Sequence, residues 1–472
     1  MDPRLLVHNT HREGMAAFHR SDPHLRRLAG HSLVWEHDLL DRLPREDPGV
    51  YTLGGARQVG KSTLLKQWML RLMWAGQDPR GIAFFSGELI DDHHVLHRLL
   101  SEALEEAQPG GLRFLLVDEV SYIKEWDRAV KFLADAGALE RAVVLLTGSD
   151  LGLIRDARTF LPGRRGPAAA VDFHLHPLTW LETCALEESL SLTERELLGG
   201  DEPADFRGLT ADAWDRCWRS LDEYLVHGGF LTALNDLYSS HTIRPATLAT
   251  YSDWIRGDIL KRGKNEAYLR EVLAAICERL GSHVSWNALA KEMSIDHPAT
   301  VAGYVDLLER MDAVFVQKAL REDRLTGAPK KARKLAFADP FILHAVRAWL
   351  EPAVDPYGER IQPFLAQPDR AAAVVESVVA AHARRRFATY YIKAAGEVDV
   401  AIVSGRRFFP IEVKWRTQLR PSDLKQIAKY DRGRIVARTE SMHEISGVPV
   451  VPLPRALALL GRGVWPPPES SV

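Results

Sequence analysis

Cysteine is scarce in this chain. Its 472 residues include three cysteines, Cys184, Cys217 and Cys277, and no two of them form a Cys-x-x-Cys pair. A disulfide framework or a cysteine-ligated zinc site needs cysteines at short, regular spacings. The sequence therefore excludes both kinds of site, and we expect three reduced, partly buried thiols in a cytosolic protein.

Long apolar runs and an excess of charge of one sign are also missing. No run approaches the roughly 20 apolar residues that a membrane helix needs, and the opening residues are polar rather than those of a signal peptide. The 61 basic and 63 acidic residues give a net charge of −2. These features predict a cytoplasmic protein without a membrane partner, in which any nucleic-acid contact comes from local basic patches.

The first part of the chain alternates strand-like and helix-like segments. Apolar, strand-like segments cover 50–53, 81–86, 113–119 and 142–149, and helical patterns lie between them at 63–70, 93–107 and 126–136. This alternation predicts an α/β fold with a parallel sheet and helices on both faces. In such sheets ligands bind at the carboxyl ends of the strands.

A phosphate-binding loop follows the first of these strands. The pattern G-x-x-x-x-G-K-[ST], with one further residue, is met by Gly55, Ala56, Arg57, Gln58, Val59, Gly60, Lys61, Ser62 and Thr63. Loop amides and a helix N-terminus form an anion cradle, so these residues are expected to bind ATP. Lys61 would reach the β- and γ-phosphates, and the hydroxyl of Ser62 would be one ligand of Mg²⁺.

Acidic and hydroxyl residues follow two further strands. Asp118 is predicted to complete the Mg²⁺ site with Ser62, and Glu119 to orient and polarise the attacking water. Thr147 and Ser149 would sense the γ-phosphate or the water. The plainer alternatives are a strand that ends at the surface in two acids and an ordinary turn at 147–149.

Two arginines, Arg164 and Arg165, follow this core. Either could stabilise transition-state charge, in cis or from a neighbouring subunit, with Arg164 as the candidate catalytic residue. The alternative is a pair of solvated loop arginines. A homo-oligomeric ring would follow from a role across a subunit interface, and a monomer stays open.

Residues 256–345 have the pattern of a winged helix. Helices are expected at 269–280, 286–293 and 299–311, with Ser285 as a cap, and then a strand at 313–318. The loop that follows is basic and would neutralise DNA phosphates through Arg321, Arg324, Lys330, Lys331, Arg333 and Lys334. The alternative is a scaffold used only for packing. Tyr304 could meet DNA or pack inward.

The last part of the chain holds a second group of acids. A helix at 372–386 contains Glu376, and two strands at 396–403 and 408–414, joined by a turn, bring Asp399 and Glu412 together with Lys414. Such carboxylates can hold Mg²⁺, with Asp399 and Glu412 as ligands, and the lysine can position water against a phosphodiester. The same alternation of charges is also that of an ordinary half-exposed strand.

Several of these segments resemble known families. The phosphate loop, Leu-Leu-Val-Asp-Glu, Leu-Thr-Gly-Ser and Leu-Pro-Gly-Arg, with the later segments 176–182, 224–230 and 256–259, are similar to AAA-type ATPases (AAA_14) that carry a C-terminal DUF4143 domain. Residues Glu376, Asp399, Glu412 and Lys414, with Gln426 and Tyr430, resemble the PD-(D/E)xK nuclease core. The resemblance implies a metal-dependent nuclease site or a nuclease-like fold retained as a DNA-binding platform.

Together these patterns predict three domains: an ATPase at 1–255 with lid helices, a winged helix at 256–345, and a nuclease-like domain at 346–472 with a flexible tail. The expected function is an ATP-hydrolysing enzyme that remodels or translocates DNA, branched or duplex, held by the last two domains. The alternative is a nucleotide-controlled switch in signalling or defence whose C-terminal domain is only a binding platform.

Overall fold

The fold is seen in a computed structural model that describes residues 6–106, 111–200, 208–394 and 396–465. The chain divides into two compact units, Met1–His176 with Arg310–Asp312, and Pro177–Glu309 with Ala313–Val472. The three predicted domain ranges stay a prediction. Of the predicted flexible tail, 465–472, only Trp465 belongs to the described residues, and it is buried.

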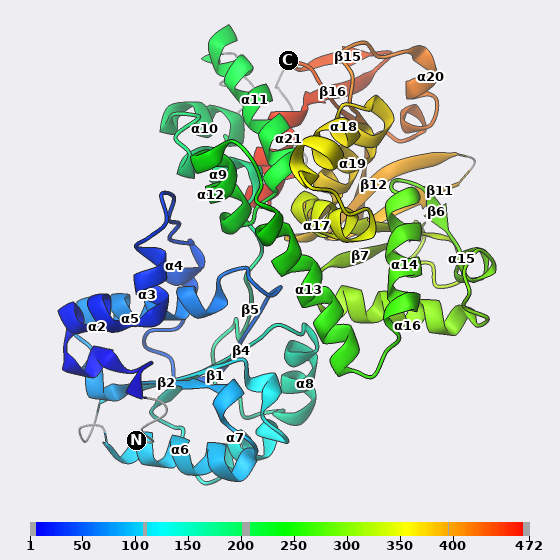
Figure 1. Ribbon diagram of the computed structural model, residues 1–472. Coiled ribbons are helices and arrows are strands. Elements are labelled where there is room, and N and C mark those ends of the chain that lie inside the picture. Colours follow the sequence, from blue (N-terminus) through cyan, green and yellow to red (C-terminus); the bar gives the residue numbers. More distant parts are fainter. Residues whose placement is uncertain (1–5, 107–110, 201–207, 395, 466–472) are drawn as a thin grey trace. The chain divides into compact units, whose positions relative to one another are not determined.

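A five-stranded parallel sheet forms the centre of the first unit (Figure 1). Its order is β2-β3-β4-β1-β5, with bounds β1 Gly49–Gly54, β2 Ile82–Ser86, β3 Arg113–Asp118, β4 Ala142–Gly148 and β5 Asp172–His174. All four pairings are parallel. The sheet is typical of P-loop nucleotide hydrolases, as the strand–helix alternation predicts.

Helices cover both faces of this sheet, because its strands bury side chains on both. Along β4, Val143 and Leu145 pack on one face and Val144 and Leu146 on the other. The first face is covered by α2 (Met15–Ser21), α3 (Pro23–Leu28), α4 (Leu39–Arg42) and α5 (Lys61–Trp74), and the second by α6 (His93–Glu106), α7 (Trp126–Asp135) and α8 (Gly152–Phe160). Short 3-10 turns complete the unit at Thr10–Glu13, Pro79–Gly81, Gly87–Leu89 and Val120–Tyr122.

The second unit begins with helices: α9 (Trp180–Leu186), α10 (Leu192–Gly199), α11 (Ala211–His227), α12 (Leu231–Ser240) and α13 (Pro245–Lys261). Between α11 and α12 the backbone of Gly229 lies against that of Leu178. Its carbonyl accepts a hydrogen bond from the Leu178 amide at 2.8 Å, and its own amide donates to Asp339 at 2.8 Å. The hydroxyl of Tyr224 also donates to the Leu178 carbonyl, at 3.0 Å. Two segments that carry the family resemblance are therefore bound to each other here.

Residues 256–345 combine three helices with a small antiparallel sheet. The helices are α14 (Glu266–Glu278), α15 (Trp286–Lys291) and α16 (Pro298–Arg310), and the sheet has the order β6-β10-β7, with β6 His283–Val284, β7 Val314–Lys318 and β10 Arg333–Phe337. Ser285 caps α15 as predicted, accepting from the Ala288 amide at 3.1 Å. Helix α17 (Pro340–Leu350) follows. The winged-helix assignment stays a prediction.

Two expectations for this region are resolved by side-chain positions. Tyr304 packs inward: it is 2% exposed, and its hydroxyl donates to the Asn265 carbonyl at 2.9 Å. The expectation that Lys334 contacts DNA phosphates is wrong, because this residue lies in β10 and is 2% exposed. The predicted basic loop instead contains a short hairpin of β8 (Leu320–Arg321) and β9 (Thr326–Gly327) before β10 begins.

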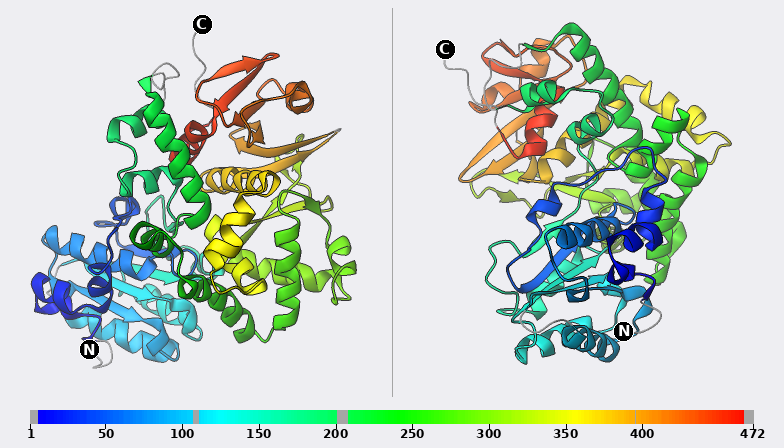
Figure 2. Two further views of the ribbon diagram at one scale, coloured as in Figure 1. Left: turned by 45° about the horizontal axis from the view of Figure 1, so that its top comes forward. Right: turned by 90° about the vertical axis from the view of Figure 1, so that its left-hand side faces the viewer.

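A six-stranded mixed sheet forms the C-terminal part, in the order β11-β12-β13-β14-β16-β15. The β12–β13 hairpin, orange in Figure 2, joins two strands of eight residues each. The strands are β11 Ala388–Lys393, β12 Glu397–Ser404, β13 Arg407–Lys414, β14 Arg434–Ala437, β15 His443–Ile445 and β16 Val448–Pro452. Its helices are α18 (Gln362–Leu365), α19 (Pro368–Arg384), α20 (Pro421–Leu424) and α21 (Leu453–Arg462), with a π-helical turn at Tyr357–Ile361 and a 3-10 turn at Ile427–Lys429. Among the described residues, no helix is both long and apolar enough to cross a membrane.

We expect Gly229→Ala to destabilise the protein by at least about 3 kcal/mol, since overpacking against fixed backbone is costly. A Cβ at this position would lie 2.1 Å from the Leu178 carbonyl oxygen. The matched control is Gly257→Ala in α13, where a Cβ meets nothing within 4 Å. That control should gain about 0.5–1 kcal/mol from helix propensity. Urea unfolding followed by circular dichroism measures both, and equal stabilities would contradict the proposed close packing.

Candidate nucleotide site and carboxylate cluster

The phosphate loop lies between β1 and α5, at the carboxyl edge of the parallel sheet. Helix α5 begins at Lys61, directly after Gly60, whose φ of +105° falls in the region that favours glycine. The loop therefore turns sharply into the helix, and the first amides of α5 face the loop.

Lys61 is 5% exposed and folds over the loop. Its Nζ donates to the carbonyls of Gly55 at 3.0 Å and Ala56 at 2.9 Å, and lies 3.4 Å from Oε1 of Glu119. The ammonium is thus held between the loop and the predicted catalytic acid. A phosphate group in the loop would meet this charge directly.

Asp118, the last residue of β3, is joined to the start of α5 and to the end of β4 through two hydroxyls. Its Oδ2 accepts from Ser62 Oγ at 2.5 Å, and its Oδ1 accepts from Thr147 Oγ1 at 2.5 Å. Burial raises the pKa of Asp118, and the hydrogen bonds from Ser62 and Thr147 oppose that rise. The predicted Mg²⁺ ligands, Ser62 and Asp118, are therefore in contact, and a hydroxyl beside a carboxylate is an oxygen donor set that fits Mg²⁺.

Glu119 is held by the end of β4. Its Oε2 accepts from the amide of Ser149 at 3.1 Å and from the Ser149 hydroxyl at 3.0 Å, while its own amide donates to Thr147 Oγ1 at 3.0 Å. Its backbone is left-handed, with φ 50° and ψ 48°, a conformation that is uncommon for a side-chain-bearing residue and clusters at functional sites. The structure thus brings together the six predicted residues at this edge: Lys61, Ser62, Asp118, Glu119, Thr147 and Ser149.

Arg57 adds a contact that the sequence did not indicate. Its guanidinium lies 5.7 Å from the centre of the Tyr122 ring and donates to the Tyr122 hydroxyl. Tyr122 belongs to the short turn that follows Glu119. The contact therefore joins the phosphate loop to the segment that carries Glu119. No motif marks this tyrosine, and only its closeness to Glu119 in the chain could have suggested it.

The two arginines lie at the other edge of the sheet. Arg165 is 9% exposed, and its side chain donates to the carbonyls of Val50 at 3.1 Å and Val171 at 2.8 Å, beside an ion pair with Asp172 at 2.6 Å. Arg164 pairs with Asp135 at the end of α7. Val50 lies near the start of β1, whereas the phosphate loop follows the end of this strand, so the structure does not bring either arginine to the loop. A role for Arg164 or Arg165, in cis or from a neighbouring subunit, stays a prediction.

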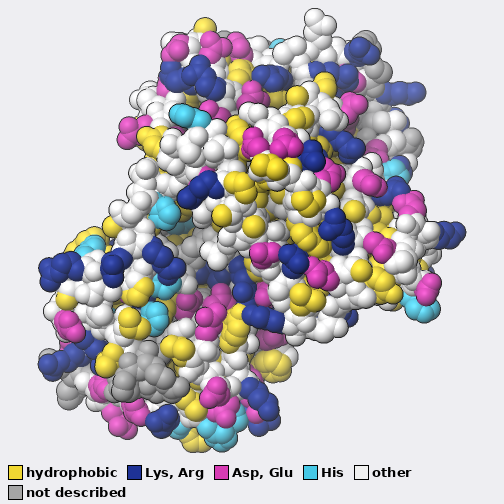
Figure 3. All heavy atoms as spheres, in the orientation of Figure 1, with side chains coloured by type: hydrophobic (Ala, Val, Ile, Leu, Met, Phe, Trp, Pro, Cys, Tyr) yellow, Lys and Arg dark blue, Asp and Glu magenta, His cyan; other side chains and the backbone are white. Residues whose placement is uncertain are grey.

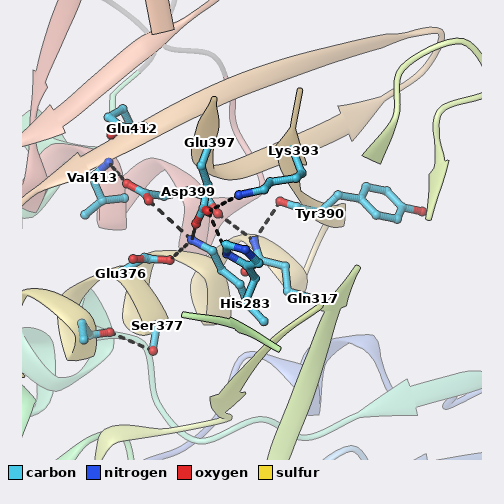
Figure 4. A network of polar contacts seen from close by, with 12 residues as sticks. His283, Gln317, Glu376, Ser377, Tyr390, Lys393, Glu397, Asp399, Glu412 and Val413 are labelled. Carbon is cyan, nitrogen blue, oxygen red and sulfur yellow. Dashed lines mark hydrogen bonds and ion pairs between the residues drawn. The ribbon is translucent and has the colours of Figure 1, made fainter. Parts of the chain in front are cut away.

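The second group of predicted residues, in the C-terminal part, does converge. Figure 4 shows the carboxylates of Glu376, from α19, and Asp399, from β12, close to each other. Asp399 Oδ2 accepts from the Val413 amide at 2.9 Å, and Lys414 lies 2.6 Å from Glu412 and 4.0 Å from Asp399. We call Glu376, Glu397, Asp399 and Glu412 the carboxylate cluster.

The sequence did not indicate Glu397 as a member of the carboxylate cluster, or Lys334 as the cation that contacts it. The ammonium of Lys334 lies 2.7 Å from Glu376, 2.7 Å from Glu397 and 3.5 Å from Asp399. This contact with the acids could not be seen in the sequence. Lys334 stands in a basic run, and the start of its strand was predicted to be a loop. The apolar run Leu335, Ala336 and Phe337 that follows Lys334 was an available signal, because such a run is consistent with a buried strand.

Burial and mutual repulsion shift the pKa values of these acids. Burial and the charge of Asp399 raise the pKa of Glu376 to about 8 and that of Glu412 to about 7. Burial opposes the charged form of Lys334, but the charges of Glu376, Asp399 and Glu397 outweigh it and raise its pKa. With Lys334 at three of its acids, the cluster does not fit a divalent metal bound as the nuclease resemblance implies.

The fold and the first site define a P-loop ATPase domain. Residues 47–184 match the family described as an AAA domain, and residues 371–456 match a domain of unknown function, DUF4143, as the resemblance predicted. Residues 219–352 match another domain of unknown function, DUF8612, which the sequence analysis did not anticipate. No curated protein matches the chain.

Solved structures share only a distant likeness with this chain. The Walker-type ATPase PABY2304 of Pyrococcus abyssi is 14% identical with a TM-score of 0.39, over 63% of this chain and 91% of that one. The ORC1 protein of Aeropyrum pernix in complex with DNA is 14% identical with a TM-score of 0.32, over 72% and 93%. A point mutant of RuvB from Thermotoga maritima is 17% identical with a TM-score of 0.27, over 57% and 82%. At these scores the likenesses carry no functional argument.

Thr147→Val should lower the turnover of ATP by about 10- to 100-fold, since it removes a hydrogen bond to a buried charged group. Thr147→Ser keeps the hydroxyl and should stay within about threefold of the parent. Steady-state phosphate release measures both, with thermal unfolding as the check on folding. Equal turnover in the valine variant would remove Thr147 from the site.

Proposed function

We propose that this protein hydrolyses ATP and uses the energy to remodel or translocate DNA bound by its second unit. One observation carries the ATPase: the start of α5 and the ends of β3 and β4 are joined by hydrogen bonds into a single site. In this proposal the loop amides and Lys61 bind the phosphates. Ser62 and Asp118 would hold Mg²⁺, which when bound neutralises phosphate charge.

Glu119 is the residue proposed to polarise the attacking water. Ser149 orients it through two hydrogen bonds to the same carboxylate oxygen, and Lys61 provides a compensating charge at the other oxygen. A general base held in this way contributes about 10²- to 10⁴-fold to a rate. An arginine from a neighbouring subunit, Arg164 in our proposal, would supply transition-state charge in a homo-oligomer.

The DNA part of the proposal rests on local basic residues rather than on the whole surface. On the face shown in Figure 3, lysine and arginine side chains are mixed with acidic ones, in keeping with 61 basic and 63 acidic residues. Between β8 and β10, Arg324, Lys330 and Lys331 are exposed. Exposed cations on one loop beside three helices could neutralise phosphates of duplex or branched DNA.

One observation favours a second candidate function, the nucleotide-controlled switch. The ammonium of Lys334 lies among the acids of the cluster, as expected if the C-terminal part is a binding platform and not a nuclease. In that case ATP would govern assembly, and DNA would not change the rate of hydrolysis.

The deciding measurement is ATP hydrolysis alone and with single-stranded, duplex, forked and four-way DNA. We expect hydrolysis that one DNA form stimulates, and we expect Glu119→Gln to lose at least about 100-fold in rate while still binding ATP. A rate that no DNA form changes, with the Glu119 variant inactive, would refute the DNA-coupled function and support the switch.

The loop between β8 and β10 can be tested separately. Changing Arg324 and Lys330 together to alanine should weaken binding of all DNA sequences alike. It should also reduce the slope of log affinity against log salt by about one for each phosphate that is no longer neutralised. Arg219→Ala, an exposed arginine on α11, is the matched control. Fluorescence anisotropy at several salt concentrations measures the slope, and an unchanged slope in the double variant would exclude this loop as the DNA-binding element.

A further inference from the structure

Lys334 is the least exposed charged side chain at the carboxylate cluster, with 3% of its side chain exposed. The four acids have between 11% and 28% of their side chains exposed. Burying an ammonium is costly unless charges of opposite sign surround it. Three carboxylates contact this one, so its position is determined by charge and not by chance packing.

Lys334 is one of three residues aligned across the small sheet β6-β10-β7. It lies opposite Gln317 of β7 and His283 of β6, and cross-strand neighbours project from the same face. All three contact β12. Gln317 Nε2 donates to the Asp399 carbonyl at 3.0 Å, and His283 Nδ1 lies 3.1 Å from Glu397. Figure 4 shows Gln317, His283, Glu397 and Asp399 together.

In three of the four acids, one carboxylate oxygen already accepts a hydrogen bond from the protein. Glu376 Oε1 accepts from Lys334 at 2.7 Å, Asp399 Oδ2 accepts from the Val413 amide, and Glu412 Oε1 accepts from Lys414. Among the buried side-chain oxygens of the four acids, all within the described part of the chain, Glu412 Oε2 alone has no hydrogen-bond partner. Mg²⁺ demands a near-octahedral shell of oxygens, and the ammonium of Lys334 already lies at three of these acids, where such an ion would have to bind.

We infer that Lys334 is a resident cation that takes the place of the divalent metal in the carboxylate cluster. The cluster then binds no metal and cuts no phosphodiester. Its acids instead hold the small sheet β6-β10-β7 against β12. This inference concerns the second unit alone, so the loss or retention of ATP hydrolysis does not bear on it.

Mn²⁺ binding to the full chain without nucleotide is the direct test, with the signal of free Mn²⁺ followed by electron paramagnetic resonance. All variants carry Asp118→Asn, which removes the metal ligand proposed in the first unit. The Asp118→Asn protein is the parent of the other variants. We expect its carboxylate cluster to bind no Mn²⁺, so adding Glu412→Gln should leave its Mn²⁺ affinity unchanged. Lys334→Met should gain at least about tenfold in Mn²⁺ affinity, because it removes the competing charge, and adding Glu412→Gln should reverse the gain.

Lys331→Met is the matched control, since this exposed neighbour donates to a backbone carbonyl and not to the acids. It should bind Mn²⁺ no better than the parent. The inference fails if the parent binds Mn²⁺ in a way that Glu412→Gln abolishes, or if a folded Lys334→Met variant gains no Mn²⁺ affinity.

A nicking assay on supercoiled DNA with Mn²⁺ does not depend on any Lys334 variant folding. We expect the carboxylate cluster of the parent not to nick DNA, so Lys414→Ala should leave the amount of nicked DNA unchanged. Nicking by the parent that disappears with Lys414→Ala would overturn the inference and restore the nuclease site predicted from the sequence.

Discussion

The close approach of two backbones at Gly229 is a constraint on which much of the second unit depends. No residue with a side chain fits there, because its Cβ would lie 2.1 Å from the Leu178 carbonyl oxygen. The same glycine is bound by Asp339, which also caps α17 by accepting from the Phe341 amide at 2.8 Å. Helices α11, α12 and α17 are thereby joined at one point, where family-like segments from distant parts of the chain meet.

The two groups of buried acids are stabilised by different means. Asp118 is stabilised by hydroxyls that can rotate, so its surroundings can exchange a proton donor for a metal ligand without moving the backbone. The carboxylate cluster is stabilised by the charge of Lys334, which cannot leave without exposing three acids to one another. Similar residue types therefore support a reactive site in one place and a fixed connection in the other.

Local sequence patterns predicted the first site because its residues lie at or just after the ends of β1, β3 and β4, which are neighbouring strands of one parallel sheet. The alternation of strands and helices is enough to bring the loop Gly55–Ser62 close to Asp118 and Glu119, because all of them lie at the ends of strands of the same parallel sheet. The role of Lys334 could not be predicted, because its partners lie on a helix and a strand from a later part of the chain. The same holds for Arg165, whose burial depends on Asp172 of an edge strand that was not predicted.

Lys334 and Asp339 lie on one short stretch of chain, β10 and the turn into α17. The carboxylates hold one end of this stretch, and Gly229 holds the other. Because both of its ends are bound, this stretch has little freedom to act as a hinge between the small sheet and α17.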